Sequence, residues 1–166
     1  MKVVIFNVGS REASDHFNKT VLQSVRPQEI ISLLSSDGAK RLLSQEQTRL
    51  WGSEPTARNI PRWKQLSAGD LALFYKDKKF VALAVIVGTE RNEKLARQMW
   101  GELPDGSTWE LLYFRQYVVP TSIALSVFNQ AFEYDPSYIP LGFTVMDEAH
   151  VDDFSREIPG VDLRTK

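Results

Sequence analysis

The stretch LALFYKDKKFVALAVIVG, residues 71–88, contains two apolar runs separated by the polar turn KDKK. Two strand-like runs joined by a short polar segment predict a β-hairpin. The second run, residues 80–88, is apolar almost throughout, so we expect both faces of this strand to be covered. The hairpin should therefore lie in the middle of a sheet.

Further strands are predicted on both sides of this hairpin. The segments concerned are KVVIFNV (2–8), TWELLYFRQYVVP (108–120, ended by Pro120) and LGFTVM (141–146). Helices are predicted from Pro27, over 39–51, over 92–101 with Asn92 as N-cap, and over 121–132 capped by Thr121 or Ser122. This order lacks a regular βαβ alternation. It predicts an α+β fold with a small curled β-sheet or open barrel of about five to six strands, flanked by short helices.

Length and composition indicate an ordinary globular chain. It has 166 residues, of which 43% are hydrophobic and 25% charged, and it contains no cysteine. The first residues lack the layout of a signal peptide, and no apolar run approaches the ~18 residues of a membrane span. We expect a cytoplasmic protein with no membrane segment. One domain should cover residues 1–148, and an acidic tail or linker to a further domain should cover 149–166.

Charge is distributed unevenly along the chain. Residues 40–97 carry 12 Lys or Arg against 6 Asp or Glu, whereas residues 98–166 carry 4 against 11. A basic central region can face a polyanion such as nucleic acid. It can equally be a solvated surface of mixed charge.

The sequence shows no established catalytic motif. It lacks a phosphate-binding glycine loop and a nucleophile elbow, and with two histidines and no cysteine it offers no spacing typical of zinc ligands. Asp105 and Glu110 superficially match a metal-dependent nuclease motif, but Leu112 occupies the place of the required lysine. We therefore predict a binding domain without a metal or cofactor, and expect any catalysis to lie in a separate domain or partner.

Two tryptophans share a local setting. Trp51 and Trp100 each end a predicted helical segment and are followed by glycine and a polar loop. Glycine after a helix allows the chain to reverse, so both rings should lie at helix–loop junctions near the rim of the sheet. They could plug the open ends of a small barrel, or they could form an aromatic cage around a flat or methylated group.

Residues 49–88 resemble the branch of the PUA-like superfamily that contains the YTH and EVE domains. The matching elements are Trp51 in RLWGS, the Arg58-Asn59 step, the Gly69-Asp70 turn and the strand LALFYKD. Trp100 and the strand 108–120 match the second tryptophan and the long strand of YTH domains. Across residues 2–146 the chain is most similar to the N-terminal domains of McrB-type, modification-dependent restriction systems.

The resemblance implies a site that holds a methylated base flipped out of duplex DNA. It assigns cage walls to Trp51, Trp100 and Leu103, and base-edge contacts to Asn7, Ser10, Ser53 and Asn59. Asn59 could instead cap a helix before Pro61. The sequence has Tyr75-Lys76-Asp77 where EVE domains have Tyr-His-Ser.

Phosphate contacts are expected from the basic region. The candidates are Arg58, Arg62, Lys64, Lys76, Lys78, Lys79, Arg91, Lys94 and Arg97. The expected partner is double-stranded DNA with a modified base, N6-methyladenine first, together with a possible fused GTPase motor domain and a partner nuclease. The alternatives are a reader of 5-methylcytosine-type bases, a YTH- or PUA-like domain that binds modified RNA, and a small-molecule-binding or interaction module with an aromatic pocket.

Overall fold

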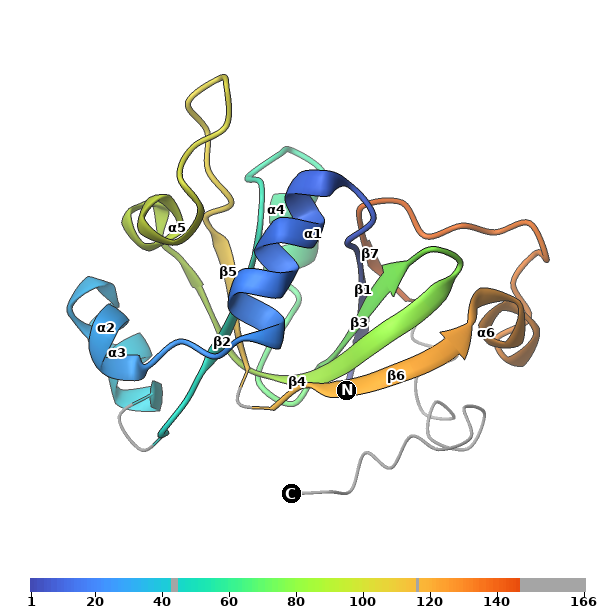
Figure 1. Cartoon of the computed structure of the whole chain (residues 1–166), viewed down its shortest axis with the longest axis horizontal. Helices are drawn as coiled ribbons and strands as arrows, with labels where there is room; N and C mark the ends of the chain where they lie inside the picture. The colour runs from blue at the N-terminus through green and yellow to red at the C-terminus, as the bar shows by residue number, and fades with distance from the viewer. Residues whose placement is uncertain (43–44, 116, 147–166) are drawn as a thin grey trace.

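The computed structural model of the protein describes residues 1–42, 45–115 and 117–146, in which the strands form one curled, mixed sheet (Figure 1). The strand order is β2-β5-β4-β3-β1-β7, and β6 pairs with β4 outside this path. The strands are β1 (Val3–Asn7), β2 (Arg49–Ser53), β3 (Leu71–Lys76), β4 (Lys79–Arg91), β5 (Leu111–Arg115), β6 (Val119–Ala124) and β7 (Phe143–Val145). The predicted α+β architecture with a small curled sheet is confirmed.

The long strand β4 causes the curl because it belongs to both halves of the sheet. Its first half pairs with β3 and β6, and its second half, from Ile86, pairs with β5. The register of the β5 pairing shifts between Ile86 and Gly88, an irregularity that bends a strand. The predicted hairpin is present, and Asp77 and Lys78 have the positive φ values that favour a tight hairpin turn.

Strand β1, at the start of the described chain, pairs with strand β7, at its end. It runs parallel to β3 and antiparallel to β7, so that Phe6 lies opposite Phe143. Phe6 faces the concave side of the sheet, where it belongs to a core that also contains Trp51, Phe74 and Tyr113.

Short helices cover the sheet at different places (Figure 1). Helix α1 (Arg11–Phe17) and the π-helix η1 (Asn18–Leu22) close the concave core, whereas α6 (Leu125–Ala131) packs on the opposite face of β1 and β3. A third core forms where β2 and β5 meet the remaining helices. These are α2 (Pro27–Ile30), the 3-10 helix η2 (Ile31–Leu33), α3 (Ser36–Leu42) and α5 (Glu93–Trp100), and α4 (Asn59–Trp63) lies beside β7.

The helix predicted over residues 39–51 is wrong in its second half. Helix α3 ends at Leu42, and Arg49–Ser53 form strand β2. Leu50 and Trp51 pair there with Phe114 and Tyr113 of β5, so long-range pairing overrides a locally helical sequence.

The single strand predicted over 108–120 is also wrong. Within that range, Leu111–Arg115 form β5, and a separate strand, β6, starts at Val119 and contains Pro120. Because β6 pairs with β4 and with no other strand among the described residues, it is an edge strand there, where a residue without an N–H is tolerated. Helix α6 correspondingly begins later than predicted, after Ala124, and neither Thr121 nor Ser122 caps it.

Two predictions are only partly addressed by the described residues. The tail 149–166 lies outside them, so the proposed boundary near 148 stays a prediction. Among the residues described, none of the helices has the length and apolarity needed to cross a bilayer.

Candidate functional site

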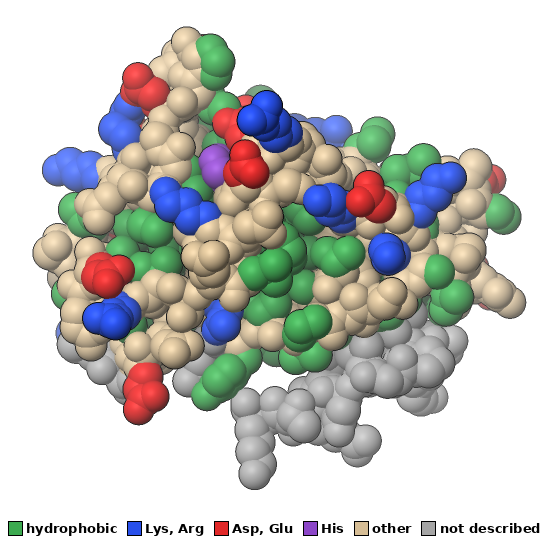
Figure 2. Space-filling model, viewed as in Figure 1, with side chains coloured by type: hydrophobic (Ala, Val, Ile, Leu, Met, Phe, Trp, Pro, Cys, Tyr) green, Lys and Arg blue, Asp and Glu red, His purple; other side chains and the backbone are tan. Residues whose placement is uncertain are grey.

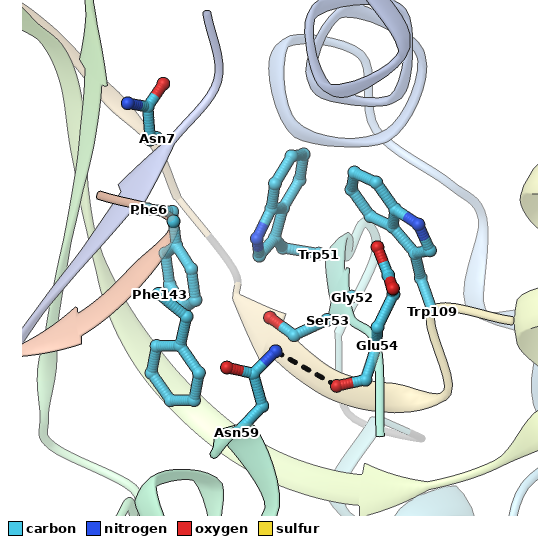
Figure 3. Close-up of a pocket in the computed structure, with 10 residues that line it drawn as sticks. Phe6, Asn7, Trp51, Gly52, Ser53, Glu54, Asn59, Trp109 and Phe143 are labelled. Atoms are coloured by element: carbon cyan, nitrogen blue, oxygen red, sulfur yellow. Dashed lines mark hydrogen bonds between the residues drawn. The ribbon is translucent and has the colours of Figure 1, made fainter. Parts of the chain in front are cut away.

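An open pocket lies at one end of the sheet, between β1, β2, α4 and β7 (Figure 3). Its cavity volume is about 120 Å³, which is small beside the ~300–1,000 Å³ of clefts that bind drug-sized ligands. The lining residues are Phe6, Asn7, Trp51, Gly52, Ser53, Glu54, Asn59, Trp109, Gly142 and Phe143.

Four aromatic side chains form the walls. Phe6 and Phe143 stack with ring centroids 5.5 Å apart, and Trp51 meets Trp109 edge to face at 5.3 Å. Trp51 is only 3% exposed because its ring also packs against Phe6 and Phe74. The pocket is therefore both a cavity and the outer end of the concave core.

Glycine at position 52 allows the two tryptophan-bearing segments to approach. A Cβ atom placed on Gly52 would lie 2.2 Å from the main-chain oxygen of Trp109 and 2.7 Å from the Trp100 ring. Any larger residue would push β2 away from the segment that leads into β5. The Trp-Gly pair in RLWGS is thus a packing requirement of this strand, and it does not end a helix.

Polar groups lie between the aromatic walls. The Tyr113 hydroxyl donates to Ser53 Oγ at 3.4 Å. The Asn59 side-chain amide donates to the Glu54 carbonyl oxygen at 3.1 Å, which turns its own oxygen toward the pocket (Figure 3). In the described part of the chain, no group donates to that oxygen. Asn59 is the first residue of α4, whereas the N-cap position belongs to Arg58.

Glu54 adds an acceptor at the rim. Partial burial, reinforced by the negative charges of Glu12 and Asp105, raises the pKa of the Glu54 carboxyl above its ordinary value. A ligand that donates a hydrogen bond to such a carboxyl group, or that carries positive charge, stabilises the charged form of the group.

Asn7 lies in the pocket, but its side chain is already engaged. The amide nitrogen donates to the Pro140 carbonyl at 3.0 Å, and the amide oxygen accepts from the Gly9 N–H at 2.9 Å. Asn7 therefore fixes the loop before β7, and it retains one N–H and one lone pair for a ligand.

Three residues predicted to contact the base lie outside the pocket. Trp100 donates from Nε1 to Thr20 Oγ1, and Trp109 occupies the position next to Trp51 that Trp100 was expected to fill. Leu103 forms a tight turn with Ser107. Ser10 is the N-cap of α1 and accepts from the Ala13 N–H.

His16 stacks on Trp100 at 5.4 Å and meets Trp109 edge to face at 4.3 Å. Burial and, secondarily, the positive charge of Lys19 lower the pKa of His16 to about 4, although Asp15 opposes the shift. The folded protein thus disfavours the charged imidazole. Through its ring contacts, His16 packs helix α1 against Trp100 and Trp109.

We expect acid to destabilise the fold through His16. Between pH 6.5 and about 4, His16 binds a proton in the unfolded chain but not in the folded chain, because its pKa is lower in the folded state. Stability is therefore complete above pH 6.5 and falls below it, by on the order of 1 kcal/mol after screening at this half-buried ring. Urea unfolding at pH 7 and pH 5 measures the loss. The loss should be smaller in His16→Gln, and equal losses in both proteins would contradict the assignment.

A buried arginine lies behind the aromatic wall. Arg115 is fully buried, and its guanidinium lies over the Phe74 ring at 4.8 Å and the Phe6 ring at 5.6 Å. Burial lowers its pKa to about 9. No hydrogen-bond partner for the guanidinium exists among the described residues, so aromatic faces provide its main stabilisation.

The predicted phosphate contacts divide into two groups. Arg62, Lys76, Arg91 and Arg97 are engaged by protein groups, for example Arg62 by the Phe143 carbonyl and Arg91 by the Glu110 carboxylate. Five are exposed and have no protein partner among the residues described: Arg58, Lys64, Lys78, Lys79 and Lys94. On the face shown in Figure 2, basic side chains are scattered among acidic ones.

Sequence reasoning missed six of the ten lining residues, namely Phe6, Gly52, Glu54, Trp109, Gly142 and Phe143. Trp109 offered the clearest signal, because it is an aromatic residue two positions before strand β5. No signal in the sequence brings Phe6 next to Phe143. Within the described residues, no group of three or more His, Asp or Glu side chains could hold a metal ion.

Structural comparison finds solved structures that are similar to this chain. The N-terminal domain of Thermococcus gammatolerans McrB, solved bound to m5C DNA, matches with a TM-score of 0.72 and 16% identity, over 94% of this chain and 96% of that chain. Human THYN1, in complex with 5-methylcytosine-containing DNA, gives a TM-score of 0.49 and 13% identity, over 95% and 98%. No protein-family model matches the sequence, nor does any curated protein at a significant level.

The match to the McrB domain shows a shared fold. It confirms the PUA-like architecture predicted from the resemblance of residues 49–88 and of the strands around them.

Proposed function

We propose that this chain binds double-stranded DNA carrying a methylated base, which leaves the duplex and enters the aromatic pocket. The observation that carries this proposal is an open pocket with four aromatic walls and inward polar groups. It occurs in the fold of a McrB domain that was solved bound to m5C DNA.

We take 5-methylcytosine as the preferred base. The McrB domain that shares the fold was solved with this modification, whereas nothing comparable supports the N6-methyladenine expected from the sequence. The pocket chemistry is compatible with cytosine, because the exocyclic amine of cytosine is a hydrogen-bond donor. Glu54 and the Asn59 side-chain oxygen are acceptors at the pocket.

The energetics require two kinds of contact. Extruding a base costs a few kcal/mol, and stacking on an aromatic side chain returns ~1–3 kcal/mol per base. Phosphate contacts must hold the rest of the duplex. We assign them first to Arg58, beside the pocket residue Asn59, and to Lys78 and Lys79 at the β3–β4 turn, since Tyr75 of β3 lies opposite Asn7.

In this proposal the chain is the specificity module of a modification-dependent restriction system. It recognises the base, while a GTPase motor and a nuclease on other domains or chains perform the chemistry. The exposed basic residues and the pocket then form part of the DNA-contacting surface that this module contributes.

Direct binding measurements test the proposal. Fluorescence anisotropy should use duplexes that differ only in one base: cytosine, 5-methylcytosine, or N6-methyladenine at a matched adenine. We expect the 5-methylcytosine duplex to bind about tenfold or more tightly than the unmodified one, the value of one methyl group in a fitted pocket. Equal affinity for all duplexes would refute a reader function. Preference for N6-methyladenine, or for methylated RNA of the same sequence, would refute the assigned ligand.

A further inference from the structure

The loop between α6 and β7 places an uncovered apolar side chain next to the pocket. Gly142 and Phe143 line the pocket, and the residue before them, Leu141, is 66% exposed. Among the large hydrophobic residues that the structure describes, none is more exposed. Ile139, two residues earlier, is also exposed.

The first part of this loop is fixed to the fold. The Asn129 amide of α6 donates to the carbonyl oxygens of Asp135 and Tyr138, at 3.3 and 3.0 Å. The Tyr134 and Tyr138 rings stack with their centroids 4.8 Å apart. These contacts order the first part of the loop in the free protein, before any ligand binds.

The second part of the loop is fixed to the pocket itself. Asn7 donates from its side chain to the Pro140 carbonyl and from its main chain to the Gly142 carbonyl, both at 3.0 Å. The Thr144 hydroxyl donates to the Leu141 carbonyl at 3.1 Å. The backbone on both sides of Leu141 is thus held at the pocket mouth, while the Leu141 side chain is exposed to solvent.

We propose that Leu141 is the wedge that enters the base stack when the methylated base leaves it. DNA-bending and base-extruding proteins insert apolar side chains between base steps, which fills the space and replaces the lost stacking contacts. A wedge must stand beside the pocket and be held in advance, because ordering it during binding would reduce affinity. Leu141 meets both conditions. This inference rests on the proposed function and adds the residue that favours the extruded state.

A wedge has a signature that a general DNA contact lacks. Its contribution depends on the work of unstacking and unpairing the target base, and that work is smaller when the base has no partner. Removing the wedge should therefore impair binding to a fully paired site much more than binding to a site where the methylated base faces an abasic position.

The test compares Leu141→Ala with wild type on these two duplexes, each containing one 5-methylcytosine. We expect about a tenfold loss of affinity for the paired duplex and less than about twofold for the duplex with the abasic position. Val127→Ala is the matched control, because Val127 is an apolar residue of α6 that is 46% exposed and lies outside the pocket lining. Leu141→Met should retain wild-type affinity.

The possible results distinguish failure of the proposed function from failure of the wedge assignment. If wild type does not prefer methylated DNA, the proposed function fails. If wild type prefers it but Leu141→Ala loses affinity equally for both duplexes, or for neither, the wedge assignment is overturned. Leu141 is exposed, so thermal unfolding should show that the variant folds like wild type.

Discussion

Replacing Trp51 with alanine is expected to lower the free energy of unfolding by about 3–5 kcal/mol, the usual loss for a buried aromatic ring. Trp51 is 3% exposed and contacts the rings of Phe6, Phe74 and Trp109. Its removal would leave a cavity at the junction of β1, β2 and β3. Urea unfolding followed by far-ultraviolet circular dichroism measures the loss without depending on tryptophan fluorescence.

Trp100→Ala is the matched comparison, because Trp100 is partly exposed and lies outside the pocket. We expect it to cost less than Trp51→Ala and to leave the preference for methylated DNA unchanged. A Trp51→Ala variant as stable as wild type would mean that the ring contributes little to the core and serves the ligand alone. The expected loss of stability would establish the plug role, and a lost preference for methylated DNA in the folded variant would establish the cage-wall role.

Filling the pocket is expected to abolish the discrimination of methylated DNA. Ser53 points into the empty space from β2 and is 8% exposed (Figure 3). A leucine at this position would occupy the volume that the flipped base needs. Ser53→Leu should therefore bind methylated and unmodified duplexes equally, which amounts to a loss of about tenfold or more on the methylated one. Competition anisotropy with the two duplexes measures this ratio.

Ser53→Ala separates blocking from the loss of the hydroxyl. It removes the acceptor of the Tyr113 hydrogen bond and leaves that buried hydroxyl without it, so it should cost about 1–3 kcal/mol in stability, but it leaves the pocket open. We expect it to retain the preference for methylated DNA. If Ser53→Leu folds and still discriminates, the base does not enter this pocket.

The parts of the fold set by local pattern could be predicted from the sequence. The hairpin over 71–88 and the helix capped by Asn92 follow from alternation, turn residues and a capping side chain, and both are present. Strand β2 could not be predicted in this way. Its residues follow a helical segment, and they become a strand only because β5, some sixty residues later, pairs with them.

Part of the site could be predicted, because several of its residues lie in the segment that carries the family resemblance. Trp51, Ser53 and Asn59 lie in one segment that carries the family resemblance, and all three line the pocket. The sequence favours Trp100 over Trp109, because the local setting of Trp100 matches that of Trp51. The contact between Trp51 and Trp109 depends instead on the pairing of β2 with β5 and on the space left by Gly52.

The pairing of β1 with β7 has a consequence for how the protein is made. Phe6 and Phe143, which stack on each other in one wall of the pocket, are separated by most of the described chain. During synthesis the N-terminal strand leaves the ribosome long before its partner, so the pocket cannot exist until residue 143 has emerged. Ligand binding in this chain therefore requires residues from both ends of the described range, and a product terminated before residue 143 would lack it.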